Sequence, residues 1–314
     1  MSAPRIPCLV GLDWGSSSLR AWLIGADGAV LAERASGKGA STLDGHAAFV
    51  AAFDELTADW RSGHPDLPVL ACGMVGSRHG WLDVPYAACP AGQAGLAAGV
   101  ARVAGGPHIV PGLLFDEPAL APDLMRGEET QILGALQLEP KLHDASCIVL
   151  PGTHSKWAQV AGGQVRRFST YMTGELYALL KQHSVLGRLL TGQAAEDRAA
   201  FLDGVDAANQ HGAQGLSHQL FAVRTLGLTG RMRASGLADY LSGLLIGHEL
   251  RSGLAWRARH GLGDRPLVLV GEPRLCARYA DALAHIGSAA GYVLDNTAPA
   301  GLLAVARAAG LVPL

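Results

Sequence analysis

The chain has 314 residues, of which 49% are hydrophobic and 17% charged, and its formal net charge is −2. Lysine and arginine are scattered singly, no stretch approaches the roughly 18 apolar residues of a membrane span, and the N-terminus lacks a signal-peptide apolar segment. These features argue against nucleic-acid and membrane partners. We expect a cytoplasmic protein with two lobes, since a chain of this size can bury two medium cores.

The first elements predicted are three antiparallel strands. Apolar alternation runs through CLVGLDW at residues 8–14 and LRAWLIG at 19–25, and resumes after the Asp27–Gly28 turn. Trp14 and Trp22 are expected to pack in a core or along a cleft wall. The loop between the first two strands is unusual because it contains a glycine and three serines.

Helices and short strands follow in the rest of the first half. Asp44 is a candidate N-cap of a helix whose apolar residues recur at helical spacing: Phe49, Phe53, Leu56 and Trp60. Residues 67–77 then predict a strand, 91–103 a helix weakened by glycines, and 108–113 a short strand. RGEETQILGALQL, residues 126–138, predicts a helix with acids in its first turn.

The pattern of strand, loop and strand starts again after residue 144. Residues 147–174 mirror residues 8–35, and superposing Gly15 on Gly152 aligns the two loops. We interpret this as a weak internal repeat of architecture. The remaining predictions are helices at 174–190, about 193–210, 237–260, 273–286 and 298–310, and strands at 266–273 and 292–295.

The two loops are candidates for binding phosphate, because glycine and hydroxyl residues offer backbone N–H and O–H donors. They comprise Gly15, Ser16, Ser17 and Ser18 in the first loop and Gly152, Thr153, His154, Ser155 and Lys156 in the second. A plain polar turn explains either loop alone equally well, but the repetition favours phosphate. His154 either donates to a phosphate or satisfies the turn, and Lys156 either faces a phosphate or is a solvated strand lysine.

Carboxylates near the two loops supply the remaining chemistry. Asp13 ends the first strand, where it is either a turn residue or a ligand of Mg²⁺ through water. Glu128 and Glu129 open a helix, and the helix dipole alone favours acids there. Their position just before the second loop also suits a general base for a substrate hydroxyl. One base, one metal ion and two phosphate loops would suffice for phosphoryl transfer.

The cysteines and histidines indicate no transition-metal site. The five cysteines form no CxxC pair, and none of the twelve histidines stands at HxH or HxxxH spacing. We therefore expect no zinc site and no disulfide framework. Any metal ion should be a hard one with oxygen ligands.

Six motifs in chain order resemble the 2-dehydro-3-deoxygalactonokinase family: DWGSSSLRAW, GMVGSRHGW, MRGEETQILGA, LPGTHSKW, YMTGELYALL and LSGLLIGHEL. The resemblance implies an α/β, two-lobed ribonuclease H-like fold of the actin, Hsp70 and hexokinase kind, with a nucleotide and sugar cleft between the lobes. It also implies a carbohydrate kinase that uses ATP and Mg²⁺ to phosphorylate the 6-hydroxyl of 2-dehydro-3-deoxy-D-galactonate. That reaction belongs to the De Ley–Doudoroff branch of galactonate degradation.

By the same resemblance, Asp13 would hold Mg²⁺ through water and the two loops would hold the phosphates of ATP. The RGEETQ segment is similar to the catalytic-glutamate helix of exopolyphosphatases, which points to Glu129 as the base, with Glu128 as the second choice. Either Arg78 or Arg126 could bind the carboxylate of the sugar acid, or could form a surface salt bridge.

Further binding residues follow from the same resemblance. Thr173 and Glu175 belong to a segment that looks like part of the cleft. Gly271 would lie at the nucleotide, but it is followed by Glu272 and Pro273 where many superfamily members carry a second glycine.

We expect the first lobe to span 1–140 together with a C-terminal helix at 297–314, and the nucleotide-binding lobe to span 141–296. Two other functions remain open for the chain. One is a polyphosphate or nucleotide phosphohydrolase, in which Glu129 would activate water. The other is a nucleotide-binding regulatory protein of the actin and Hsp70 type. A homodimer is possible, and no motif reports which sugar-acid epimer is preferred.

Overall fold

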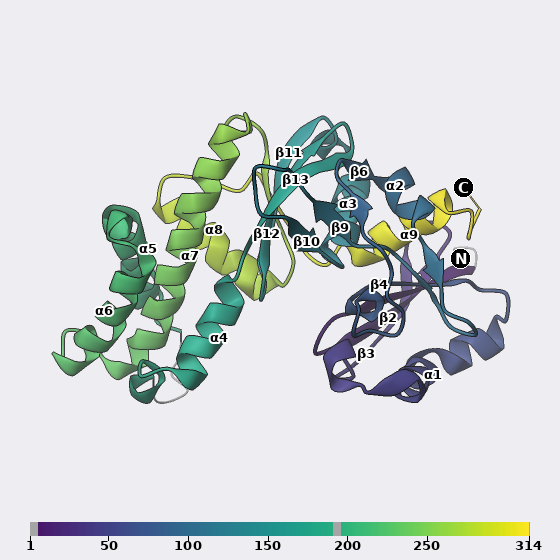
Figure 1. Cartoon of the computed structure of the whole chain (residues 1–314), viewed down its shortest axis with the longest axis horizontal. Coiled ribbons are helices and arrows are strands. Elements are labelled where there is room, and N and C mark those ends of the chain that lie inside the picture. Colours follow the sequence, from purple (N-terminus) through teal and green to yellow (C-terminus); the bar gives the residue numbers. More distant parts are fainter. Residues whose placement is uncertain (1–5, 191–195, 314) are drawn as a thin grey trace, which may run out of the picture. The chain divides into compact units, whose positions relative to one another are not determined.

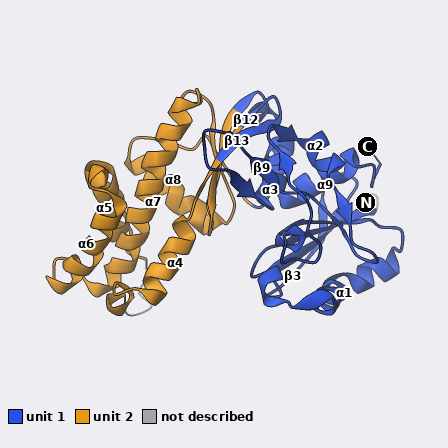
Figure 2. Cartoon of the chain, in the orientation of Figure 1, with its two compact units in different colours: residues 1–145, 160–168, 296–314 blue, residues 146–159, 169–295 orange. Residues whose placement is uncertain are grey.

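The computed structural model describes residues 6–190 and 196–313, and the chain divides into two compact units (Figures 1 and 2). Unit 1 contains residues 1–145, 160–168 and 296–314, and unit 2 contains residues 146–159 and 169–295. Within the described residues, no helix combines the length and the apolar character needed to cross a membrane.

The main sheet of unit 1 is built on the three strands expected from the sequence. They are β1 (Pro7–Trp14), β2 (Leu19–Gly25) and β3 (Val30–Ser36), which pair in antiparallel order as predicted. On the other side of β1 lies β4 (Val69–Gly73), in parallel. The sheet order is β3-β2-β1-β4-β8-β7, ending with the two-residue strands β8 (His108–Ile109) and β7 (Ala101–Arg102).

One face of this sheet packs on α1 (Gly45–Gly63). The predicted apolar face of α1 is buried in one core with Leu12 and Trp14: Phe49, Phe53, Leu56 and Trp60. Asp44 stands at the N-cap position as expected, but its side chain makes no capping hydrogen bond. Trp22 is also buried, which confirms the core assignment of both early tryptophans.

The alternate residues of β1 face helices α3 (Glu128–Leu138) and α9 (Ala298–Ala308). A Cβ built on Gly11 would lie 3.0 Å from Leu302 of α9. Because successive strand residues point to opposite faces, Asp13 shares this face with Gly11. The two helices meet backbone to backbone, since a Cβ on Gly134 would lie 1.9 Å from the Thr297 carbonyl oxygen.

The region at 91–103 differs from its prediction. Only α2 (Gln93–Ala98) is helical, between β6 (Ala91–Gly92) and β7. Gly99 ends the helix, and Val100 lies between it and the strand. A separate three-stranded sheet has the order β10-β9-β5, formed by β10 (Asp123–Met125), β9 (Leu113–Phe115) and β5 (Ala87–Ala88).

A second sheet repeats the strand order of the main sheet of unit 1. Its order is β6-β13-β12-β11-β14-β15, and the last five strands match β3-β2-β1-β4-β8, with β11 parallel to β14 and β14 parallel to β15. Most of this sheet belongs to unit 2, but β6 and residues 160–168, which include most of β13, belong to unit 1. The strands are β11 (Ala145–Leu150), β12 (Ser155–Ala161), β13 (Gln164–Tyr171), β14 (Leu267–Val270) and β15 (Tyr292–Leu294). The internal repeat predicted from the sequence is therefore confirmed as a repeat of topology.

Five longer helices belong to unit 2: α4 (Thr173–His183), α5 (Arg198–His211), α6 (Leu216–Leu228), α7 (Ala234–Arg259) and α8 (Pro273–His285). Helices α5 and α7 pack closely, because a Cβ on Gly243 would lie 1.9 Å from the Phe201 carbonyl oxygen. The helix predicted at 193–210 begins later, at Arg198, and residues 193–195 lie outside the described residues. The sequence analysis missed α6.

Single-turn 3₁₀ helices complete the described chain: η1 (Ala40–Thr42), η2 (Met74–Gly76), η3 (Pro140–Leu142), η4 (Gly187–Leu189) and η5 (Gly212–Gln214).

Candidate active site

The first predicted loop joins β1 to β2 and exposes its hydroxyl groups. The side chains of Ser16, Ser17 and Ser18 face solvent. Backbone hydrogen bonds fix the loop. Ala40 N–H donates to the Gly15 carbonyl and Ser41 N–H to the Ser16 carbonyl, both at 2.9 Å. The carbonyl oxygens of Gly15 and Ser16 are thereby occupied, while the serine hydroxyls stay available.

Asp13 lies at the carboxyl end of β1, half-buried and in contact with a thiol. Its Oδ1 lies 4.0 Å from the Cys72 Sγ atom of β4. Burial raises the pKa of Asp13 to about 6, and the neighbouring Glu128 charge adds to this effect while Arg20 opposes it. The pKa of Cys72 is raised by burial and by the charges of Asp13 and Glu129. These couplings place Asp13, Glu128 and Glu129 around Cys72.

Two glycines bring the start of α3 against the end of β4. Gly73 and Gly127 have φ values of +92° and +109°, in the region that favours glycine. A Cβ on Gly127 would lie 3.2 Å from the Gly73 Cα. This close approach places the two glutamates of α3 beside the ends of β1 and β4.

Glu129 is fully buried, and hydrogen bonds hold both of its carboxylate oxygens. Its Oε2 accepts from Gly127 N–H at 2.7 Å, and its Oε1 accepts from the Thr130 hydroxyl at 3.0 Å. Burial, followed by repulsion from Glu128, raises the pKa of Glu129 to about 8. Glu128 is partly exposed, and its Oε2 accepts from Arg126 N–H at 2.9 Å.

The two predicted arginines of unit 1 have different surroundings. Arg126 is only 8% exposed, its Nη2 donates to the Val84 carbonyl at 2.7 Å, and its guanidinium lies over the Tyr86 ring. Its Nε and Nη1 atoms are buried and have no partner among the described residues. The alternative prediction, that Arg126 forms a surface salt bridge, is therefore wrong. Arg78 is exposed.

The second predicted loop, residues 152–156, joins β11 to β12 and divides into an exposed and a buried part. Thr153 and His154 are exposed, whereas Ser155 and Lys156 are buried. Gly152 N–H donates to the Ser155 hydroxyl at 3.3 Å, which closes the turn. The reading of Lys156 as a solvated strand lysine is wrong, because its residue is only 4% exposed.

The start of α4 packs on this second loop. Glu175 N–H donates to the Thr153 carbonyl at 3.0 Å, and the Glu175 carboxylate contacts the His154 imidazole. A Cβ on Gly174 would lie 2.5 Å from the Gly152 carbonyl oxygen. The predicted residues Thr173 and Glu175 therefore lie with the second loop in unit 2, whereas Arg78 and Arg126 belong to unit 1.

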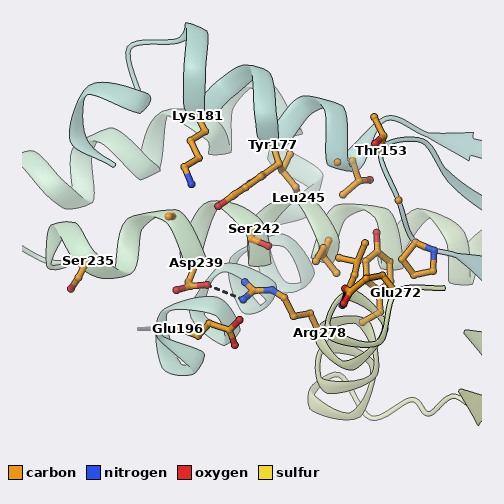
Figure 3. Close-up of a pocket in the computed structure, with 18 residues that line it drawn as sticks. Thr153, Tyr177, Lys181, Glu196, Ser235, Asp239, Ser242, Leu245, Glu272 and Arg278 are labelled. Carbon is orange, nitrogen blue, oxygen red and sulfur yellow. Dashed lines mark hydrogen bonds and ion pairs between the residues drawn. The ribbon is translucent and has the colours of Figure 1, made fainter. Parts of the chain in front are cut away.

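A cavity of about 900 Å³ in unit 2 opens beside the second loop (Figure 3). Helices α4, α7 and α8 supply Tyr177, Asp239 and Arg278 to its wall. The Arg278 Nη1 donates to Asp239 Oδ1 at 2.9 Å, and its Nε and Nη2 atoms have no partner among the described residues. The sequence analysis missed these three residues, because each lies in an ordinary helical pattern with no motif of its own.

The surroundings of Glu272 show why it follows Gly271 at the position where many superfamily members carry a second glycine. Gly271 has a φ of +141° at the end of β14, and Glu272 is the N-cap of α8. The Glu272 carboxylate accepts from Arg274 N–H at 3.1 Å and from Leu275 N–H at 2.7 Å. The residue that replaces the second glycine thus starts the helix and also lines the cavity.

Comparison with known proteins identifies the family. The pattern of the 2-keto-3-deoxy-galactonokinase family matches residues 13–305. The chain belongs to the 2-keto-3-deoxy-galactonokinase family. A probable 2-dehydro-3-deoxygalactonokinase of Rhizobium meliloti (strain 1021) is 39% identical over 95% of this chain and 96% of its own length. The 2-dehydro-3-deoxygalactonokinase of Escherichia coli (strain K12) is 37% identical over 95% of this chain and 97% of its own length.

A solved structure supports the same assignment. The crystal structure of a candidate 2-dehydro-3-deoxygalactonokinase from Sinorhizobium meliloti superposes with a TM-score of 0.85 and 36% sequence identity, over 98% of this chain and 100% of the other. The predicted membership in the galactonokinase family and the predicted α/β kinase fold are confirmed. All six motifs lie within the matched residues or at their boundary.

Proposed function

We propose that this galactonokinase-family chain transfers the γ-phosphoryl group of ATP to the 6-hydroxyl of 2-dehydro-3-deoxy-D-galactonate. The observation that carries the proposal is the match to named 2-dehydro-3-deoxygalactonokinases along nearly the whole chain, at 37–39% identity. The wider setting of the reaction, galactonate degradation by the De Ley–Doudoroff route in the cytoplasm, is part of the proposal.

The nucleotide would bind to unit 2, with its phosphates at the second loop. Gly152 and Thr153 of this loop line the 900 Å³ cavity, which is large enough for a nucleoside. The exposed His154 would donate to a phosphate when it turns away from Glu175. Gly271, Tyr177 and Arg278 would surround the nucleoside, and Arg278 would have to turn to present its buried Nε or Nη2 to an acceptor atom of a base or ribose.

Magnesium would be held at Asp13. Among the described residues, no group of three or more His, Cys, Asp and Glu side chains could hold a metal ion. The ion would therefore rely on one carboxylate, on water and on the nucleotide phosphates, as Mg²⁺ commonly does. Asp13 fits this role, because it is a half-buried oxygen ligand whose pKa is raised mainly by burial, and a bound cation would offset that cost of its charge. Bound Mg²⁺ would neutralise charge on the transferred phosphoryl group.

The α3 carboxylates would supply the base. Glu129 is the proposed acceptor of the hydroxyl proton, because its pKa of about 8 lies close to a working pH near neutrality. Its two oxygens are occupied in this structure, so it must release Gly127 or Thr130 to reach a substrate. Glu128 is already partly exposed, and this observation favours it as the alternative base.

The sugar-acid carboxylate would bind to Arg126. Buried N–H groups without a partner are costly, and a carboxylate can accept from one of them, Nε–H or Nη1–H, since Nη2 is already bonded to Val84. Arg78 is exposed and would act only at the periphery. Thr173 and Glu175 remain proposed contacts from unit 2. The Thr173 hydroxyl already donates to Glu249, so towards a substrate its oxygen can only accept.

A coupled assay of ADP release tests the proposal. Purified protein with MgATP should release ADP only when 2-dehydro-3-deoxy-D-galactonate is present, and mass spectrometry should find the 6-phosphate. The gluconate epimer, tested in parallel, reports epimer preference. Release of phosphate from ATP or polyphosphate without an acceptor would instead favour the phosphohydrolase. Nucleotide binding with no turnover would favour a regulatory protein. Sedimentation in the same buffer tests the proposed homodimer.

A further inference from the structure

A buried glutamate of α7 holds the second loop from behind. Glu249 is 3% exposed and accepts three side-chain hydrogen bonds. Trp157 Nε1 donates to its Oε1 at 2.9 Å, the Tyr279 hydroxyl donates to its Oε2 at 2.6 Å, and the Thr173 hydroxyl also donates to Oε2. These donors come from β12, α8 and α4, so one carboxylate joins the elements that surround the loop.

Hydrogen bonds connect Glu249 to the backbone of the loop through Tyr279 and Ser155. Tyr279 gives its hydroxyl hydrogen to Glu249, so its oxygen is free to accept from the Ser155 hydroxyl at 3.1 Å. Ser155 Oγ in turn accepts from Gly152 N–H at 3.3 Å. The Ser155 hydroxyl also lies 3.5 Å from the Gly152 carbonyl oxygen, so Ser155 contacts both the turn and Tyr279. An ionised carboxylate can only accept, so the hydrogen between Tyr279 and Glu249 comes from Tyr279.

The chemistry of this position calls for a carboxylate. Three donors converge on Glu249, and the indole N–H of Trp157 can never accept. An amide offers one acceptor oxygen, so no orientation of a glutamine could serve Trp157 together with both hydroxyls as they now point. Burial raises the pKa of Glu249, and hydrogen bonding from Thr173, Tyr279, Trp157 and, least of all, Ser155 lowers it. Such a buried group is costly unless it is fully bonded, as it is here.

We propose that Glu249 is a positioning residue for nucleotide binding, acting through Tyr279 and Ser155 to fix the second loop in the conformation that exposes Thr153 and His154. The inference rests on the proposed function, which places the nucleotide phosphates at this loop. Glu249 and Ser155 do not touch the nucleotide in this proposal. With the Gly152 N–H bonded inside the turn, the following residues of the loop are the ones left to face a phosphate.

The test compares Tyr279→Phe, Ser155→Ala and the double variant with wild type, and uses Tyr171→Phe as the matched control. Like Tyr279, Tyr171 has a hydroxyl that bonds a serine, here Ser252 of α7 at 3.2 Å. It does not line the cavity and takes no part in the hydrogen bonds that link Glu249 to the loop. Affinity for MgADP is measured by calorimetry, the KM of ATP and of the sugar acid by the coupled assay, and folding by thermal unfolding.

We expect Tyr279→Phe and Ser155→Ala each to weaken MgADP binding by about fivefold to twentyfold. Ser155→Ala reports loop order specifically, because Ser155 does not line the cavity, whereas Tyr279 does. The KM of ATP should rise by a similar factor and that of the sugar acid by less than about twofold. The affinity of the double variant for MgADP should be no lower than that of the single variant with the lower affinity, because both substitutions break the same chain of hydrogen bonds. Glu249→Gln should also weaken MgADP binding, while Tyr171→Phe should behave as wild type.

Wild-type MgADP affinity in folded Tyr279→Phe and Ser155→Ala would overturn the proposal. An equal loss in Tyr171→Phe, or an equal rise in both KM values, would also overturn it, because either result indicates general destabilisation. If Tyr279→Phe does not fold, Ser155→Ala decides alone, since it removes one hydroxyl. Calorimetry with MgADP needs no acceptor, so a wild-type protein that binds MgADP but phosphorylates no sugar acid would refute the proposed function and leave this test intact.

Discussion

The two loops occupy equivalent positions in two sheets of the same strand order, yet they are held in different ways. Backbone hydrogen bonds from residues 40 and 41 hold the first loop, whereas the second has a backbone hydrogen bond from Glu175 and, in addition, a buried carboxylate and two hydroxyls. The strands before them also differ, because Asp13 lies near the end of β1 and Leu150 at the end of β11. A repeated topology thus provides two loop sites, and local side chains decide which of them carries charge.

The largest effect is expected from removing the charge beside the first loop. Asp13→Asn should lower kcat by about three orders of magnitude, because a neutral amide holds Mg²⁺ poorly and the metal supplies several kcal/mol to such reactions. Circular dichroism should show an intact fold, and the variant should unfold at no lower temperature than wild type because a buried charge is removed. Near-normal turnover would show that Asp13 is not the magnesium residue.

The next substitution separates the two glutamates of α3. If Glu129 is the base, Glu129→Gln should lower kcat by about 10²- to 10⁴-fold with little change in the KM of ATP. Glu128→Gln is the matched control, with the same chemistry one residue earlier, and should lose less than about tenfold. The reverse order of effects would assign the base to the partly exposed Glu128.

A smaller loss of activity should follow from substituting the buried Arg126. Arg126→Lys keeps the charge but loses the planar guanidinium and its several N–H donors, so the KM of the sugar acid should rise by about tenfold. The KM of ATP should stay within about twofold of wild type. Arg78→Lys at the exposed site provides the control. Equal sensitivity of both positions would remove the special role of Arg126.

Glycine substitutions test the backbone support of each loop directly. A Cβ on Gly39 would lie 2.3 Å from the Ser16 carbonyl oxygen, while a Cβ on nearby Gly37 would meet nothing within 4 Å. Gly39→Ala should therefore lower the free energy of unfolding by about 1–3 kcal/mol, and Gly37→Ala should not lower it. Gly174→Ala should have the same cost at the second loop and should also weaken MgADP binding. Urea unfolding of all three variants checks the comparison.

The smallest effect concerns pH and stability. The pKa of Glu129 is raised from its ordinary 4.5 to about 8, so the folded state binds this proton more tightly than the unfolded state. Its contribution to stability is present below pH 4.5 and is lost as the pH rises through 8. Without nucleotide or Mg²⁺, Glu129→Gln should therefore unfold at a higher temperature than wild type at pH 8, with the difference shrinking toward pH 4.5. A difference independent of pH would contradict the shifted pKa.

Local sequence patterns predicted the elements that later form the site. Alternation identified β1, β2 and β3, and the acids after Gly127 marked the start of α3. Helix α6 was missed because only Gln219 and Val223 are buried on it, so its apolar residues carry no clear helical period. The short α2 was overestimated because the glycine that ends it lies inside a run of helix-forming alanines.

The surroundings of the site residues could not be predicted in the same way. The burial of Lys156 and Arg126, and the hydrogen bonds of Glu249, depend on partners far away in the sequence. Trp157 and Glu249 are 92 residues apart, and Ser155 and Tyr279 are 124 apart. No local periodicity records such pairs. The LSGLLIGHEL motif did contain Glu249, but its role emerged only from the side chains that converge on it.

The contact between α3 and α9 has a consequence for how the protein is made. The Thr297 hydroxyl donates to the Gln131 carbonyl across 166 residues, and Gly134 fits against the backbone of Thr297. During synthesis on the ribosome, α3 therefore has no α9 to pack against until all of unit 2 has been synthesised. Until then the face of α3 that packs on α9 has no cover, and transiently exposed surface of this kind makes an incomplete chain prone to aggregation.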